Sequence, residues 1–246
     1  MCIRDRYDGS PFHGWQVQKS ITTVQGVVFD AIKKLDMNCE NFVGAGRTDA
    51  GVHAIGQVAH VDLATKRDCE TVQKAINYYL NKYPVSILNA RLVNNQFHAR
   101  FSAIKRHYIY KIFSRKTDLT FEKNQYWHVR HSLNKSNMQL AANYLTGRHD
   151  FSAFRSSICQ ASSPIKTIDA ISIQSEEIRD GVVYQLNFSA RSFLHHQVRS
   201  IVGCLEKVGC GKWGAKKIQE ILLSKDRSRC AALAPSGGLY LARIDY

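Results

Sequence analysis

The sequence has no long apolar run and few acidic residues for its size. No stretch of about 18 consecutive apolar residues occurs, so we expect no transmembrane helix. Asp and Glu number 20 against 34 Lys and Arg, which gives a formal net charge of +14. This excess indicates a polyanionic partner, either a nucleic acid or an anionic membrane surface. The basic residues are scattered along the chain rather than gathered on one helix or tail, and this favours nucleic acid.

The cysteines lack the pattern of a disulfide framework. There are seven, an odd number, at irregular spacings and with no C-x-x-C pair. This usage predicts reduced, mostly buried thiols in a cytoplasmic protein. His195, His196, Cys204 and Cys210 are residue types that bind zinc, but their spacing matches no zinc pattern. We therefore expect no metal site and no cofactor.

The start of the chain is unusual. No signal peptide is visible. Residues 1–6, Met-Cys-Ile-Arg-Asp-Arg, are too charged for the apolar region of such a peptide and too irregular for a buried strand. We interpret them as an unnatural start.

Apolar periodicity predicts helices and strands in both halves of the chain. Helices are expected at residues 23–36, from 72 to near Tyr83-Pro84, and at 135–146, 194–208 and 215–224. Strands are expected at residues 41–43, 57–63, 85–93, 106–114, 165–175, 182–190 and 238–245. Thr22 or Thr23 is predicted to cap the first helix, and Gly147 to follow the end of the third. With the turn at Arg179-Asp180-Gly181, this pattern predicts an α+β fold whose two similar halves meet near residue 104.

The segment most suggestive of chemistry is Gly44-Ala-Gly-Arg-Thr-Asp-Ala-Gly-Val-His53. Its glycines allow tight turns and close approach of a ligand around one arginine, Arg47, and one carboxylate, Asp49. The alternative interpretation is a plain turn in which Asp49 bonds the backbone and Arg47 is solvated. The segment is neither a phosphate-binding loop, since no Gly-Lys-Ser/Thr follows, nor a dinucleotide fingerprint.

Residues 46–53, Gly-Arg-Thr-Asp-Ala-Gly-Val-His, resemble the signature of the tRNA pseudouridine synthase A family. Further blocks resemble that family in the same order along residues 7–246. They are Tyr7-Asp8-Gly9-Ser10 with Phe12 and Gly14-Trp15-Gln16, His98-Ala99-Arg100-Phe101-Ser102-Ala103 with Arg106 and Tyr108, Asp150 to Arg155, Phe193 to Gly203, and Gly238 to Leu241.

The resemblance implies a fold, an activity and partners. The fold would be two ferredoxin-like domains with mainly antiparallel sheets that form a central RNA-binding cleft. Residues 1–104 would carry the catalytic aspartate loop, and residues 105–246 the active-site tyrosine and arginine. The activity would be the conversion of uridine to pseudouridine at positions 38, 39 and 40 of the tRNA anticodon arm, by a cytoplasmic homodimer that uses no cofactor and no membrane.

The resemblance also implies roles for individual residues. Asp49 would be the covalent catalyst, attacking the ribose or the base or stabilising a sugar cation. Tyr108 would stack on the uracil and help to move the C5 proton. Arg199 would pair with Asp49, with Arg106 as a competing partner. Arg47 would hold the flipped state of the RNA, although an ion pair with Asp49 is its simpler role.

Several other residues are expected to contact the tRNA. The candidates within the matched blocks are Phe97, His98, Arg100, Phe101, Arg106 and Arg155. Lys105, Lys111 and Lys166 are further phosphate candidates, and Lys166 stands where the family often has arginine.

Two alternatives remain open at this stage. One is a tRNA-binding protein without catalysis, which would not need Asp49. The other is a related synthase with a different target position, which the sequence distinguishes poorly.

Overall fold

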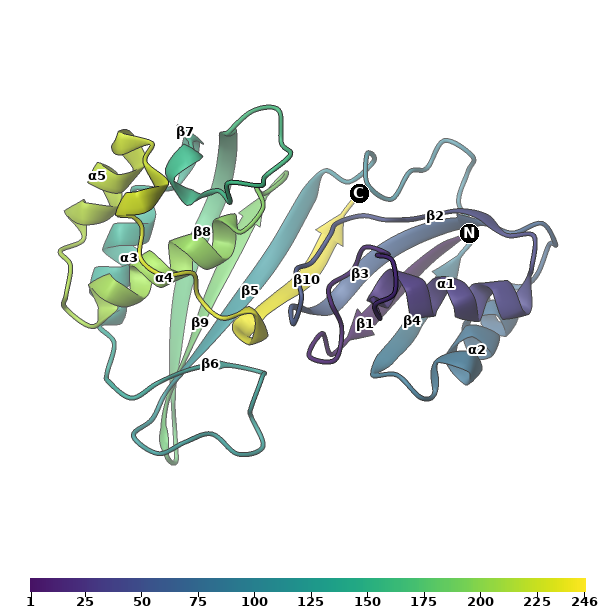
Figure 1. Cartoon of the computed structure of the whole chain (residues 1–246), viewed down its shortest axis with the longest axis horizontal. Helices are drawn as coiled ribbons and strands as arrows, with labels where there is room; N and C mark the ends of the chain where they lie inside the picture. Colours follow the sequence, from purple (N-terminus) through teal and green to yellow (C-terminus); the bar gives the residue numbers. More distant parts are fainter. The chain divides into compact units, whose positions relative to one another are not determined.

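We describe the protein from a computed structural model that covers residues 1–246 (Figure 1). The chain divides into two compact units. Unit 1 contains Met1–Arg106 and Tyr240–Tyr246, and unit 2 contains His107–Leu239. Each unit combines helices with a mostly antiparallel sheet, so the predicted α+β class is confirmed.

The sheet of unit 1 is built around strand β3, His53–Asp62. Strand β1 (Cys2–Tyr7) lies antiparallel between β3 and β4 (Val85–Arg91). Strand β2 (Glu40–Gly44) pairs antiparallel with the end of β3, and β10 (Leu239–Asp245) pairs parallel with its start. The start of β3, which directly follows the segment that contains Asp49, therefore pairs with the last strand of the chain.

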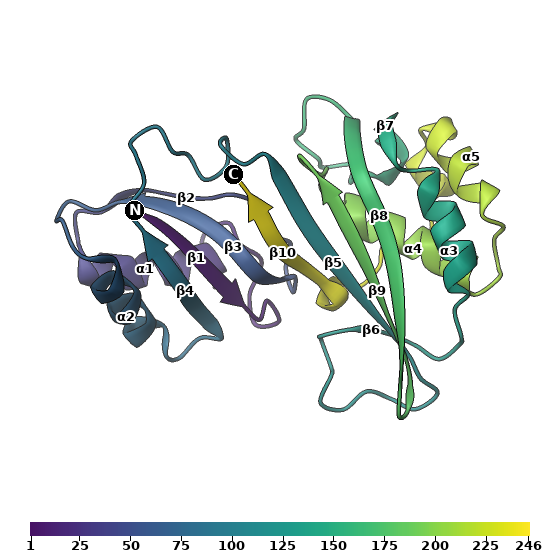
Figure 2. The same cartoon turned by 180° about the vertical axis from the view of Figure 1, so that it is seen from behind.

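Two helices of 12 residues cover one face of this sheet (Figures 1 and 2). Helix α1 spans Val24–Leu35, and Thr23 caps it by accepting a hydrogen bond from the Gly26 N–H, as predicted. Helix α2 spans Cys69–Leu80, and Asp68 caps it in the same way. Each helix buries an apolar stripe, formed by Val24, Val27, Val28, Ala31 and Ile32 in α1 and by Val72, Ile76 and Leu80 in α2.

The expectation that residues 1–6 are too irregular for a strand is wrong. Cys2–Tyr7 is the strand β1, with neighbours on both sides. Ile3, Asp5 and Tyr7 point inward and are buried, while Arg4 and Arg6 are exposed. The alternation was obscured because a carboxylate occupies one of the three buried positions.

The sheet of unit 2 follows the order β5-β9-β8-β7. Its strands are β5 (Lys105–Ser114), β9 (Gly181–Ala190), β8 (Ile165–Ile178) and β7 (Gly147–Asp150), and a short strand β6 (Trp127–Val129) pairs parallel with β5. The predicted hairpin is confirmed, since Ile178 pairs with Gly181 across the two-residue connection.

Helix α3 (Lys135–Asn143) packs on β8 and on helices α4 (Gln197–Gly209) and α5 (Lys216–Ser224), and the three helices lie on one side of the sheet (Figure 2). Helix α3 ends before Tyr144, so Gly147 does not terminate it. Gly147 instead opens β7 with a φ of 102°. Helix α4 begins at Gln197, three residues later than predicted, because His196 adopts a left-handed φ of 64°.

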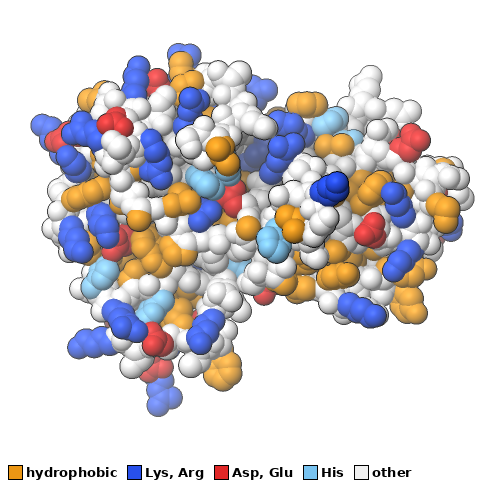
Figure 3. Space-filling model, in the orientation of Figure 1, with side chains coloured by type: hydrophobic (Ala, Val, Ile, Leu, Met, Phe, Trp, Pro, Cys, Tyr) orange, Lys and Arg blue, Asp and Glu red, His pale blue; other side chains and the backbone are white.

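All seven cysteines are free thiols. None of the helices combines the length and the apolar character that a membrane crossing requires. Lys and Arg side chains are spread over the visible face of each unit rather than gathered in one place (Figure 3). This distribution agrees with the scattered basic residues of the sequence.

Candidate active site

The segment 44–53 is fastened to unit 1 on several sides. The Thr48 carbonyl accepts a hydrogen bond from the Trp15 N–H at 3.0 Å, and the Thr48 hydroxyl lies 2.8 Å from the Tyr7 hydroxyl. The Gln57 side chain donates to the Gly46 carbonyl at 2.7 Å. Thr48 and Gln57 are buried, so these bonds are shielded from water. The backbone of this loop is therefore fixed by hydrogen bonds, and the segment is not a solvated turn.

Glycines allow residues 9–15 to pack directly against this loop. Gly14 has a φ of 88°, and a Cβ atom there would lie 2.7 Å from the Thr48 carbonyl oxygen. A Cβ atom at Gly9 would overlap the Val52 carbonyl oxygen. This close approach gives a physical reason for the two sequence blocks to occur together.

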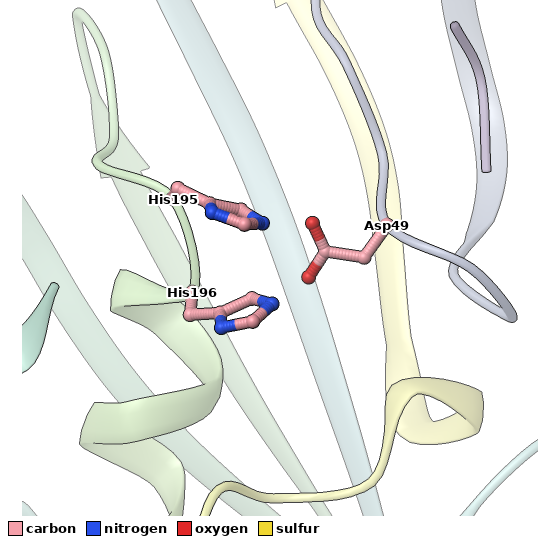
Figure 4. Close-up of side chains that lie close together, drawn as sticks. All are labelled: Asp49, His195 and His196. Atoms are coloured by element: carbon pink, nitrogen blue, oxygen red, sulfur yellow. The ribbon is translucent and has the colours of Figure 1, made fainter. Parts of the chain in front are cut away.

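Asp49 and Arg47 flank the buried Thr48. The Asp49 carboxylate is half-buried and extends from the loop after β2 (Figure 4). Its main-chain carbonyl accepts the Val52 N–H at 3.1 Å, which closes a tight turn. Arg47 is exposed and forms no ion pair, so the simpler role of an ion pair with Asp49 is not realised.

Arg106 joins the loop to a second predicted block. One guanidinium nitrogen donates to the carbonyl oxygens of Ala45 at 2.8 Å and Arg100 at 2.9 Å. Both acceptors lie in unit 1, with Arg106 at the start of β5. Arg106 was predicted to contact tRNA. In the structure its guanidinium holds two main-chain segments together.

The block 97–103 is held on β3 by His60. Burial, followed by the nearby charge of His98, lowers the pKa of His60. The neutral ring then accepts a hydrogen bond from the Ala99 N–H at 3.1 Å. His98 in turn accepts from the main-chain N–H groups of Arg100 and Phe101. His98 therefore shapes a turn of the backbone.

Phe101 and Arg100 form the exposed end of this block. The Phe101 ring is 73% exposed, and the Arg100 guanidinium lies 5.5 Å from its centre. A bare aromatic ring beside a cation suits stacking on a base next to a phosphate. Phe97 differs, because its half-buried ring packs 5.0 Å from the ring of Tyr246.

In unit 2, strand β5 presents Tyr108 and Tyr110 on one side. Tyr108 is 9% exposed, and its ring stands edge-on to Phe193 at 5.2 Å between centres. Tyr110 is fully buried, and its hydroxyl donates to the Pro235 carbonyl at 2.7 Å. Burial raises the pKa of Tyr110, which removes it as a proton carrier near neutral pH. Of the two rings, Tyr108 is the one with a contact to the loop before α4.

The start of α4 holds Arg199, His195 and His196. Arg199 Nε donates to the Ala234 carbonyl at 2.8 Å, and the Arg199 carbonyl accepts the Ala234 N–H. The rings of His195 and His196 are tilted against each other, with centres 3.9 Å apart, and extend from the turn that precedes the helix (Figure 4). His195 precedes the helix, so it does not share a helix face with Arg199 four residues later.

The remaining basic candidates differ in environment. Arg155 is half-buried in the segment whose Ser156 N–H donates to the His195 carbonyl at 3.0 Å, and its guanidinium forms no ion pair. Lys105 and Lys166 are half-buried at strand positions. Burial lowers the pKa of Lys111, whose amine lies 5.6 Å from the Tyr126 ring centre. Arg155 is thus the candidate best suited to a phosphate.

Sequence reasoning missed the residues that support the loop. Tyr7, Trp15 and Gln57 were quoted as motif letters or strand positions, without a role. Their contacts join positions up to 41 residues apart, which periodicity does not reveal. The only available signal was the co-occurrence of the two blocks.

Comparison with known proteins identifies the family of the chain. The family model described as tRNA pseudouridine synthase matches residues 3–102 and 141–246. The chain is 49% identical to the tRNA pseudouridine synthase A of Maricaulis maris (strain MCS10), over 99% of this chain and 96% of that protein. It is 44% identical to the protein of that name from Ruegeria sp. (strain TM1040), over 99% and 94% of the two chains. It is 47% identical to that of Xanthobacter autotrophicus (strain ATCC BAA-1158 / Py2), over 98% and 96%.

The chain therefore belongs to the tRNA pseudouridine synthase family, and it is an isomerase that converts uridine to pseudouridine. A solved structure titled "Crystal Structure of a Cbf5-Nop10-Gar1 Complex" matches at 14% identity with a TM-score of 0.39, over 98% of this chain and 48% of that chain.

Proposed function

We propose that the protein modifies uridines 38, 39 and 40 in the anticodon arm of tRNA, with Asp49 as the covalent catalyst. The observation that carries this proposal is the loop 44–53, whose backbone is fixed through buried Thr48 and from which the half-buried Asp49 carboxylate extends. A catalytic group gains most from a backbone that does not move during the reaction.

The reaction moves the glycosidic bond from N1 to C5 of uracil. It needs a group that captures the sugar or the base, a means of turning the detached base and removal of the C5 proton. The Asp49 carboxylate supplies the first. Tyr108 stacks on the uracil and assists the proton transfer, and Arg199 positions the catalytic carboxylate. No redox partner or energy source is required, and we propose no cofactor.

Recognition of the RNA uses exposed cations and rings. Arg47, which is exposed and without an ion pair, stabilises the state in which the target nucleotide has left its stack. Arg100, Arg106 and Arg155 contact phosphates, and Phe101 offers its exposed ring to a base. Phe97 and His98 hold the segment that carries Arg100 and Phe101, Phe97 by packing on Tyr246 and His98 by accepting the Phe101 N–H.

We further propose that each half is a ferredoxin-like domain, 1–104 and 105–246, in a cytoplasmic homodimer. Support for the fold comes from unit 1, whose β1-α1-β2-β3-α2-β4 order has β1 between β4 and β3. Unit 2 contains a β5-α3-β8-β9-α4 series that follows the same alternation. Light scattering at several protein concentrations, with and without tRNA, tests the dimer.

The decisive experiment uses an unmodified tRNA transcript with uridine at positions 38, 39 and 40. The transcript is incubated with the native protein, with Asp49→Asn, and with Asp30→Asn as a matched control on the exposed face of α1. Pseudouridine is then mapped chemically along the RNA. We expect signal at those positions with the native and Asp30→Asn proteins and none with Asp49→Asn.

Other outcomes separate the alternatives. Signal at different uridines would keep Asp49 as the catalyst and would assign other target positions. Unchanged activity of Asp49→Asn would overturn the assignment of Asp49. Tight, salt-sensitive tRNA binding by a folded protein that modifies no uridine would instead favour a tRNA-binding protein without catalysis.

A further inference from the structure

Three potential metal ligands of unit 2 converge at the end of α4, away from the loop before that helix. Nε2 or Nδ1 of His131, a carboxylate oxygen of Glu206 and Sγ of Cys210 all lie within 4.8 Å of one another. We name these three residues the α4-end cluster. His131 follows strand β6, Glu206 lies in the last turn of α4, and Cys210 directly follows that helix. The proposed reaction uses none of them.

Glu206 makes this cluster unusual. Its side chain is only 3% exposed, although a buried carboxylate is costly unless its charge is compensated. Oε1 lies 2.8 Å from His131 Nε2. Oε2 lies 2.9 Å from Lys207 Nζ, yet it accepts no hydrogen bond of good geometry. The buried acid is therefore directed at the His131 imidazole through Oε1, while Lys207 lies beside Oε2.

The backbone holds the cluster in place from both sides. The Ser114 hydroxyl donates to the His131 carbonyl at 2.7 Å, and the Asn134 N–H donates to the Gly209 carbonyl at 2.8 Å. Glu206 and Cys210 are four residues apart at the end of one helix, and the Cys210 N–H donates to the Glu206 carbonyl. Their side chains therefore share one face, which His131 meets from the opposite segment.

We propose that the α4-end cluster binds a divalent zinc ion through His131, Glu206 and Cys210. Imidazole, thiolate and carboxylate together suit zinc, whereas magnesium and calcium prefer oxygen ligands alone. Three protein ligands leave one tetrahedral position for water. As the Sγ–Zn bond forms, the Cys210 thiol releases its proton to solvent, and the ion replaces the His131 contact at Oε1.

The ion would fasten the segment after β6 to α4. Lys207 keeps its position beside Oε2, while Oε1 takes the metal. Because the ion binds only the folded arrangement, zinc would stabilise unit 2 in proportion to its concentration. The site serves the structure and takes no part in the conversion of uridine, so its existence does not depend on the role of Asp49.

Cobalt(II) reports thiolate ligation directly, since a thiolate bound to it gives a strong charge-transfer absorption. The full chain, kept reduced, is titrated with Co²⁺, beside Cys210→Ser and Cys159→Ser. Cys159 is a matched control because it is a partly exposed thiol elsewhere in unit 2. We expect the absorption in the native and Cys159→Ser proteins and its loss in Cys210→Ser. No absorption, or one that survives Cys210→Ser, would overturn the proposal.

Zinc affinity is then measured by competition with a chromophoric chelator. We expect His131→Ala and Glu206→Gln each to weaken Zn²⁺ binding by roughly tenfold or more. His131 is 46% exposed, so its substitution leaves the packing intact even where Glu206→Gln lowers stability. We also expect Zn²⁺ to raise the Tm of the native protein and not that of His131→Ala. Equal affinity of native protein and His131→Ala would refute the site.

Discussion

The hydroxyl of Tyr7 lies 2.8 Å from the hydroxyl of Thr48, and both side chains are buried. The bond joins the last residue of β1 to the residue that precedes Asp49. Strand β1 thereby fixes the backbone from which the Asp49 carboxylate extends. This hydrogen bond couples the stability of the sheet to the position of the loop backbone.

We expect Tyr7→Phe to reduce the rate of pseudouridine formation while leaving tRNA affinity nearly unchanged. Loss of one buried hydrogen bond costs about 0.5–1.5 kcal/mol of unfolding free energy, and the loop before Asp49 becomes less fixed. Single-turnover kinetics and tRNA binding measure the two effects separately. Tyr184→Phe is the control, because the Tyr184 hydroxyl makes a comparable buried bond to Leu133 in unit 2. A similar loss of rate in both variants would contradict the specific role of Tyr7.

Gly14→Ala should damage the same loop from the other side. A Cβ atom would lie 2.7 Å from the Thr48 carbonyl, and the φ of 88° adds strain of about 1–3 kcal/mol. We expect a lower midpoint of urea unfolding and a lower turnover rate. Gly214→Ala has open space around its added methyl group and should be neutral for activity. A normal turnover rate in Gly14→Ala would show that the close approach is dispensable.

Substitutions of Arg106 and Arg100 should have different effects, the first on the stability of the protein and the second on tRNA binding. Lysine cannot reproduce the contacts of the Arg106 guanidinium with the carbonyls of Ala45 and Arg100. Arg106→Lys should therefore lower the free energy of unfolding by about 1–2 kcal/mol, although it keeps the charge. Chemical denaturation measures this effect.

Arg100→Ala should leave stability unchanged and weaken tRNA binding. Removal of one phosphate contact lowers the slope of log affinity against log salt concentration by about 1. The slope is obtained from binding measurements at several salt concentrations. A destabilised Arg100→Ala protein, or an unaltered salt slope, would show that the exposed guanidinium does not contact phosphate.

Asp5 should make the protein less stable as the pH rises. Burial raises the pKa of its carboxyl to about 8, and neither oxygen has a hydrogen-bond partner. The unfolded chain has an ordinary pKa near 4, so the folded state holds the extra proton. Stability is therefore lost between about pH 4 and pH 8, by up to about 1.4 kcal/mol per pH unit.

We expect Asp5→Val to raise the free energy of unfolding, by on the order of 3 kcal/mol near pH 8 and by less near pH 5. Urea denaturation at a series of pH values measures the difference. Asp5→Asn is the matched control, because it keeps the shape and removes the titration. Parallel pH profiles of the native and Asp5→Asn proteins would exclude ionisation of Asp5 as the cause.

The secondary structure was predictable wherever periodicity was strong. The helices α1, α2 and α5 and the β8–β9 hairpin lie close to their predicted bounds. The errors have local causes. Strand β1 was rejected because Asp5 occupies a buried position, and α4 was begun too early because the left-handed turn at His196 leaves no mark in the apolar pattern.

By itself, the sequence determined the family, the α+β class and the loop that contains Asp49, because these depend on local order and on motif letters. Only the tertiary structure decided which residues support that loop. Tyr7, Gly14 and Arg106 reach it through contacts between distant segments, which periodicity does not encode. The same reason hides the α4-end cluster, since chain folding brings His131 to Glu206 and Cys210, far from it in sequence.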